Sequence, residues 1–130
     1  MLKHLLLSAV LCTSITSVFA ETITTEEAVK SYKSVLNPNY TRLAIPPTPH
    51  DMSLPDFGRG IIGWGTGPDG AKTRLENIKK SDVKKIKKQD VTLEMVQTWQ
   101  KFYENETLRN PGNPTAPYRA QLMQKIASFW

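Results

Sequence analysis

The sequence has very little of what metal sites and nucleophilic catalysis require. Its 130 residues include one cysteine, Cys12, and two histidines, of which only His50 lies beyond the first 20 residues. Zinc sites and cysteine–histidine nucleophile pairs need more of these side chains. There is no G-x-S-x-G motif and no P-loop motif. The sequence therefore predicts no metal and no cofactor, and it favours a protein that is not an enzyme.

Long hydrophobic runs are also lacking, except near the start. A basic beginning at Lys3 is followed by a mostly apolar stretch, residues 5–18, and then by the small residue Ala20. These are the parts of a secretory signal peptide. A membrane anchor is the alternative, but the apolar stretch is shorter than the roughly 20 residues that span a bilayer. We expect cleavage after Ala20, loss of Cys12, and a periplasmic or secreted protein with no transmembrane segment.

Runs of alternating apolar and polar residues, typical of strands, are absent, whereas helical periodicity recurs. Helices are expected to begin at Thr24, at Asp69 or Gly70, at Ser81, at Thr92 and at Thr115. The last two are joined by a short turn and should form an antiparallel pair. The predicted fold is mainly α: a small single domain of about four to five short helices, with a long irregular segment rich in proline and glycine.

We divide the chain into three parts: a signal peptide (1–20), an N-terminal helix with a proline-rich strap (21–56), and a helical core domain (57–130). The strap is irregular because five of the nine prolines lie in residues 37–56, where each removes a donor and disfavours helix. A flexible linker is the alternative. An extended strap is favoured by the apolar side chains that could hold it to the domain, namely Leu43, Ile45, Met52 and Leu54.

Six of the seven glycines lie in residues 58–70. Residues 58–63 spell G-x-G-x-x-G, but no core strand precedes them and three more glycines follow, so we reject a dinucleotide site. One interpretation is a tight loop that buries Trp64 in the core. The other is the wall of a ligand site, in which Trp64 offers its face, backbone amides around Thr66 hold an anion, and Arg59 and Arg74 bind acidic groups.

A second polar cluster surrounds the turn before the last helix. Asn110 and its neighbours are turn-forming residues, and Arg119 follows in the first turns of the helix. In a structural interpretation these residues organise the turn. In a functional one, Arg109, Asn110 and Arg119 line a pocket with Tyr103 from the preceding helix.

Lysines dominate residues 72–88, and six of them form a predicted electrostatic surface: Lys79, Lys80, Lys84, Lys85, Lys87 and Lys88. The simplest interpretation is a solvated helical face. The alternative is contact with an anionic surface such as phospholipid, lipopolysaccharide phosphate or nucleic acid. Nucleic acid is the weakest of these partners, because arginines and interleaved aromatic residues are missing.

Three motifs resemble a known bacterial domain family: G-W-G-T-G-P at residues 63–68, W-x-x-F-Y at 99–103, and R-N-P-x-N-P at 109–114. The chain resembles, over about residues 57–127, an uncharacterised domain of small secreted proteins of gammaproteobacteria. It is also similar to C-terminal modules of Rhs-type polymorphic toxins. The resemblance implies a bacterial, exported, mostly helical module, and an antagonistic or envelope-directed role if the toxin association holds. It supplies no established activity.

From these observations we expect a non-catalytic binding module for an anionic or polar ligand of the cell envelope. The alternative is a small cofactor-free hydrolase or toxin-like effector acting on cell-wall glycan or nucleic acid. It would use a carboxylate such as Glu94 or Asp69 beside Tyr103, Arg109 and Arg119. A third possibility is an assembly subunit whose partner is another protein.

Overall fold

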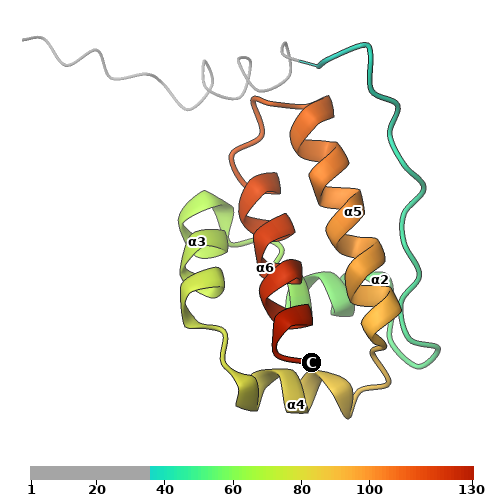
Figure 1. The fold of residues 1–130 in the computed structure, drawn as a ribbon, viewed down its shortest axis with the longest axis vertical. Helices are drawn as coiled ribbons and strands as arrows, with labels where there is room; N and C mark the ends of the chain where they lie inside the picture. Colours follow the sequence, from blue (N-terminus) through green and yellow to red (C-terminus); the bar gives the residue numbers. More distant parts are fainter. Residues whose placement is uncertain (1–35) are drawn as a thin grey trace, which may run out of the picture.

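A computed structural model describes residues 36–130 of the chain (Figure 1). The expected signal peptide and nearly all of the helix expected at residues 24–36 therefore lie outside the described residues. Within them the protein is helical and contains no strand, which confirms the mainly α prediction. The elements are α2 (Leu54–Phe57), a π-helical turn η1 (Gly58–Ile62), α3 (Gly67–Asn77), α4 (Lys80–Lys87), α5 (Leu93–Arg109) and α6 (Ala116–Ser128). No helix in the described part is both long enough and apolar enough to cross a membrane.

The two longest helices, α5 and α6, lie side by side and antiparallel, as predicted (Figure 1). Thr92 begins α5, and its hydroxyl accepts a 3.1 Å hydrogen bond from the Met95 backbone N–H. Pro117 lies in the first turn of α6, where its missing N–H costs nothing. The two helices bury their facing sides in one core, to which they contribute Trp99, Phe102, Leu122, Met123 and Ile126 among others.

Helices α3 and α4 begin earlier than the sequence predicted. Helix α3 starts at Gly67, with Pro68 in its first turn, rather than at Asp69 or Gly70. Helix α4 starts at Lys80, because the Asp82 carboxylate accepts a 2.9 Å hydrogen bond from the Lys79 backbone N–H and fixes the helix start there. The prediction of Ser81 as the capping residue was therefore wrong, since Ser81 is already helical.

The first part of the glycine-rich segment is helical, although the sequence predicted a loop. Helix α2 continues without a break into the π-helical turn η1, and Gly63 ends it with a left-handed φ of 87°. Glycine at position 58 permits this arrangement, because the Trp64 indole lies against the face where a Cβ would stand. Gly58 thus permits close packing against Trp64 inside the helical turn, and Gly63 permits the left-handed conformation that ends it.

The proline-rich strap, residues 37–53, runs along α5 (Figure 1). Its backbone is fixed by hydrogen bonds from Asn37 N–H to the Arg109 carbonyl (2.7 Å), from the Asn105 amide to the Thr41 carbonyl (2.9 Å), and from the Trp99 indole to the Pro47 carbonyl (3.2 Å). An extended strap was expected over residues 37–56, and residues 37–53 are non-helical, but Leu54, Pro55 and Asp56 lie in helix α2. The Ser53 hydroxyl caps this helix by accepting a 3.2 Å hydrogen bond from the Asp56 N–H, and Pro55 is tolerated in its first turn.

The side chains that hold the strap are partly different from those predicted. Leu43 and Ile45 remain 45% and 54% exposed, so they do not hold it down. Pro46 and Pro49 are buried instead, and Met52 and Leu54 pack against the core as expected. In this extended segment Pro46 and Pro49 occupy inward positions, whereas Leu43 and Ile45 turn outward.

Candidate functional site

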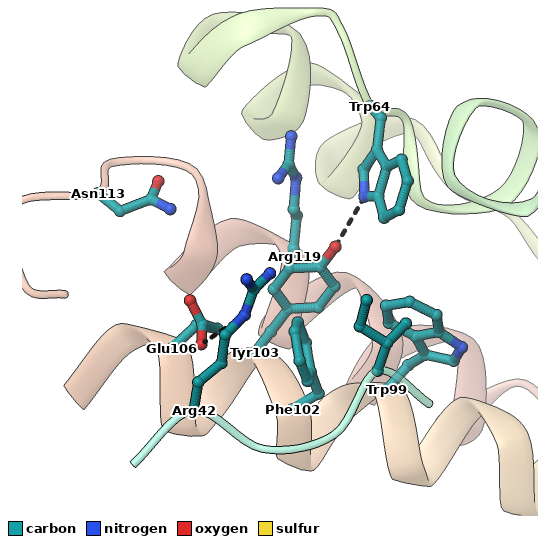
Figure 2. A pocket seen from close by; sticks show the side chains of 9 residues that line it. Arg42, Trp64, Trp99, Phe102, Tyr103, Glu106, Asn113 and Arg119 are labelled. Carbon is teal, nitrogen blue, oxygen red and sulfur yellow. Dashed lines mark hydrogen bonds and ion pairs between the residues drawn. The ribbon is translucent and has the colours of Figure 1, made fainter. Parts of the chain in front are cut away.

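A pocket of about 200 Å³ opens where the strap, the glycine-rich segment, α5 and α6 meet (Figure 2). It joins residues from four separate segments of the sequence. Its lining consists of Arg42, Ile45, Trp64, Trp99, Phe102, Tyr103, Glu106, Asn113 and Arg119. Three residues predicted for a site, Trp64, Tyr103 and Arg119, are brought together here.

Trp64 is half-buried between the core and this pocket. Its ring meets Trp99 edge-on, with centroids 6.2 Å apart and planes at 71°. Its indole N–H donates a 2.7 Å hydrogen bond to the phenol oxygen of Tyr103, which Figure 2 shows as a dashed line. One side of Trp64 therefore packs against the core, and the other lines the pocket.

Tyr103 supplies a hydroxyl group to the pocket. Burial raises the pKa of this phenol, and the hydrogen bond from Trp64 and the charge of Arg119 oppose that rise only in part. The group is therefore protonated at neutral pH. Because its oxygen already accepts from Trp64, its own O–H hydrogen remains available to an acceptor in the pocket. The guanidinium carbon of Arg119 lies 5.7 Å from the centre of the same ring.

Glu106 contributes the one carboxylate among the residues that line the pocket. It is 7% exposed, and both of its oxygens accept 2.8 Å hydrogen bonds from Arg109. This bidentate pairing raises the pKa of Arg109. Arg42 from the strap adds a longer ion pair to Glu106, at 4.0 Å. Arg109, predicted to line a pocket, is instead the partner that neutralises the carboxylate.

The turn between α5 and α6 presents an amide. The Asn113 side-chain oxygen accepts hydrogen bonds from the backbone N–H and the hydroxyl of Thr115, at 3.0 and 2.7 Å. Among the described residues the Asn113 NH₂ group donates no hydrogen bond, and Asn113 lines the pocket. Asn110, predicted for the site, does not line the pocket; its backbone caps α5 and its side-chain oxygen is buried with no partner among the described residues. Arg119 Nε is likewise buried and unpartnered there.

The remaining residues predicted around the glycines lie elsewhere. Arg74 donates to the carbonyls of Ile61 (2.9 Å) and Gly60 (3.1 Å), which closes the end of η1, and burial lowers the pKa of this guanidinium. The Thr66 hydroxyl donates to the Gly63 carbonyl at 2.8 Å. Both side chains line a different hollow, of about 470 Å³, and Arg59 is exposed and lines neither.

The carboxylates considered for a hydrolase are also distant from the pocket. Glu94 and Asp69 lie exposed in the first turns of α5 and α3, and neither belongs to the lining. No cluster of side chains that could hold a metal ion occurs in residues 36–130.

Sequence reasoning missed six lining residues, namely Arg42, Ile45, Trp99, Phe102, Glu106 and Asn113. Glu106 carried a usable signal, since it stands three residues after Tyr103 and three before Arg109, on the same side of a helix. Arg42 and Ile45 carried none, because nothing in the strap indicates which part of α5 it crosses.

The six lysines of the predicted electrostatic surface are all exposed on and beside α4. The pocket is built from the later half of α5 and the beginning of α6, whereas α4 crosses the opposite end of this pair, where α5 begins and α6 ends (Figure 1). The basic surface and the pocket are therefore two separate features.

The site and fold are those of a small helical domain whose family has no assigned function. Residues 32–130 match the family described as a domain of unknown function, DUF4951, and the chain belongs to it. A similar solved structure is the NMR structure of a protein from Acinetobacter baumannii. It is 57% identical, over 72% of this chain and 88% of that one, with a TM-score of 0.62. No curated protein matches the sequence.

Proposed function

We propose that this protein is a non-catalytic binding module that holds a small anionic ligand in the pocket between the strap, Trp64, α5 and α6. The observation that carries the proposal is the convergence of hydrogen-bond donors in a lining whose one carboxylate is already paired. Tyr103 offers its O–H, Asn113 its NH₂ group, and Arg42 and Arg119 their guanidinium groups. The acceptor that lines the same wall, the Glu106 carboxylate, is already occupied by Arg109.

The charge of the wall also favours an anion. The guanidinium groups of Arg42 and Arg109 pair with the single carboxylate of Glu106, and the guanidinium group of Arg119 lines the same pocket. The excess of positive charge is partly buried, where hydrogen bonds to a charged acceptor are stronger than in water. The buried, unpartnered Nε of Arg119 would gain most from such an acceptor.

The size and the apolar part of the lining define the rest of the ligand. A volume of about 200 Å³ lies below the roughly 300–1,000 Å³ of pockets for drug-sized molecules. Ile45, Phe102 and the face of Trp64 complete the wall. We therefore propose a small carboxylate or phosphate ester that carries a ring or short apolar portion, or one end of a larger molecule with that chemistry.

The hydrolase alternative gains no support from this arrangement. Paired-carboxylate hydrolysis needs two carboxyl groups across one site. The lining holds one, and its two oxygens are bound to Arg109. A toxin-like role remains a proposal that rests on the resemblance of the G-W-G-T-G-P and R-N-P-x-N-P motifs alone.

The site is tested by NMR titration with matched pairs of small molecules, such as benzoate with benzamide and glycerol 3-phosphate with glycerol. The Trp64 indole N–H is the reporter, because it lies in the pocket wall. We expect the anionic member of a pair to shift this resonance and the neutral member to leave it unchanged.

Two variants at arginines make this test specific. Arg119→Met should weaken binding about tenfold or more, since it removes a charge-assisted hydrogen bond. Arg59→Met is the matched control, because Arg59 is exposed and does not line the pocket. Equal binding of neutral and anionic members, or wild-type affinity in Arg119→Met, would exclude the proposed site.

We further propose that the ligand is met in the periplasm or outside the cell. The support is the signal-peptide pattern of residues 1–20. A tagged chain should fractionate with the periplasm or medium, and removal of residues 1–20 should retain it in the cytoplasm. Cytoplasmic recovery of the full chain would contradict export without affecting the binding site.

A further inference from the structure

The basic face of α4, defined by Lys79, Lys80, Lys84, Lys85, Lys87 and Lys88, is the largest feature that the pocket does not explain. All six side chains are exposed. None of the ion pairs among residues 36–130 involves them. The nearest acidic residue in the helix, Asp82, turns its carboxylate to the Lys79 backbone N–H. The charge of this face is therefore not neutralised by the described part of the protein.

The packing of α4 directs this charge away from the domain. Val83 and Ile86 are 1% and 4% exposed and anchor the inner side of the helix. At 100° per residue, Lys84, Lys85 and Lys88 lie on the opposite, outer side. Helix α4 also lies across the end of the α5–α6 pair, so its outer side forms one end of the described domain (Figure 1).

We propose that the basic face of α4 docks on the surface of a lipid bilayer that contains anionic phospholipids. Four to eight basic residues on one helix are typical of proteins that bind anionic headgroups. Trp130 stands beside the face, half-buried, with the Lys87 ammonium 5.0 Å from its ring centroid. An indole at the edge of a lysine cluster suits the headgroup region, where tryptophan is enriched.

Nucleic acid suits this face less well. Its charges are all lysine, and no arginine is available for bidentate phosphate or base contacts. The docked orientation also leaves the pocket open. The lining residues of α5 extend from Trp99 to Glu106, which lie roughly 9 and 20 Å along the helix from Leu93 at about 1.5 Å per residue, so the pocket is set back from a bilayer that contacts α4.

The test is co-sedimentation of the full chain with vesicles of phosphatidylethanolamine and phosphatidylglycerol, and with neutral phosphatidylcholine vesicles. The outer-face variant is Lys84→Gln/Lys85→Gln/Lys88→Gln. The control, Arg59→Gln/Lys72→Gln/Lys101→Gln, loses the same charge at exposed positions outside α4. Circular dichroism confirms that both are folded.

We expect binding that requires phosphatidylglycerol and falls with salt. The outer-face variant should bind roughly 100-fold more weakly, because each lysine near an anionic surface contributes about a factor of five. The control should stay within about threefold of wild type, since charges far from the surface are screened. Arg119→Met should bind vesicles normally, which separates this surface from the pocket.

Three results would overturn the proposal. One is an equal loss of vesicle binding in both triple variants, which would show that binding depends on the net charge of the protein and not on the basic face of α4. Another is binding to neutral vesicles that is as strong as binding to phosphatidylglycerol vesicles, both in the wild type and in the outer-face variant. The third is α4-dependent binding to a 20-base-pair DNA duplex without binding to vesicles, which would assign the face to nucleic acid.

Discussion

The indole N–H of Trp64 donates to the phenol oxygen of Tyr103 at 2.7 Å, across 39 residues of sequence. This bond joins the glycine-rich segment to α5 and closes one side of the pocket. The bond also determines how Tyr103 can contact a ligand. The phenol oxygen already accepts from Trp64, whereas the O–H hydrogen can still be donated. The proposed preference for anions depends on that division.

A double-mutant cycle measures this bond directly. Trp64→Phe and Tyr103→Phe should each destabilise the fold, and their coupling energy should be about 1 kcal/mol, typical of one net hydrogen bond. Urea unfolding of the four proteins gives the coupling. A coupling energy of zero would show that the two groups do not interact in solution.

Adding a methyl group at Gly58 should displace Trp64. A Cβ at this position overlaps the indole, whereas a Cβ on Gly60 meets nothing within 4 Å. Gly58→Ala should therefore cost about 1–3 kcal/mol, as expected for overpacking, and should shift the Trp64 indole resonance. Gly60→Ala should be neutral or slightly stabilising, because both glycines lie in a helical turn. Similar stabilities of the two variants would refute the close contact.

The Glu106–Arg109 pair should matter more for stability than surface ion pairs do. Arg109→Met leaves a nearly buried carboxylate with only the distant Arg42, and we expect a loss of about 2 kcal/mol, reduced from the fully buried case by the partial exposure of Arg109. Glu106→Gln/Arg109→Met should recover part of that loss. Thermal unfolding distinguishes these outcomes, and an unchanged midpoint in Arg109→Met would argue against the pair.

The raised pKa of Tyr103 predicts that part of the free energy of unfolding is lost at alkaline pH. Burial raises its pKa in the folded state above the usual value of about 10. The protonated phenol then favours folding fully below pH 10, and this contribution disappears as pH rises through the folded-state pKa. The stability difference between wild type and Tyr103→Phe should accordingly shrink over the range in which the pH rises above about 10. A difference that stays constant over this range would contradict a buried phenol.

Much of the fold could be predicted from local chemistry. Thr92 as a cap, Pro117 in a first helical turn, and the periodic apolar faces of α5 and α6 are local signals, and the structure confirms each. The π-helical turn at Gly58–Ile62 could not be predicted in this way. Glycine usually breaks helices, and only the approach of Trp64 shows why a glycine is required inside one.

The residues of the candidate site could likewise be predicted only in part. Trp64, Tyr103 and Arg119 stood out as residue types suited to binding, and they share the pocket. Arg59, Thr66 and Arg74 stood out for the same reason and lie elsewhere, because the direction of a side chain after a run of glycines depends on backbone angles. The strap residues Arg42 and Ile45 depend on a register that only packing against α5 fixes.

By itself the sequence determined the class of the protein: a mainly helical domain, poor in the residues of metal and thiol chemistry, with a lysine-rich helix. These properties depend on composition and on contacts between near neighbours in the chain. Only the tertiary structure decided that the lysine-rich helix lies across one end of the α5–α6 pair, apart from the pocket, and that Arg42, Trp64 and Arg119 line the same pocket. Such distinctions arise from contacts between distant segments, which burial and hydrogen bonding select and which local spacing does not encode.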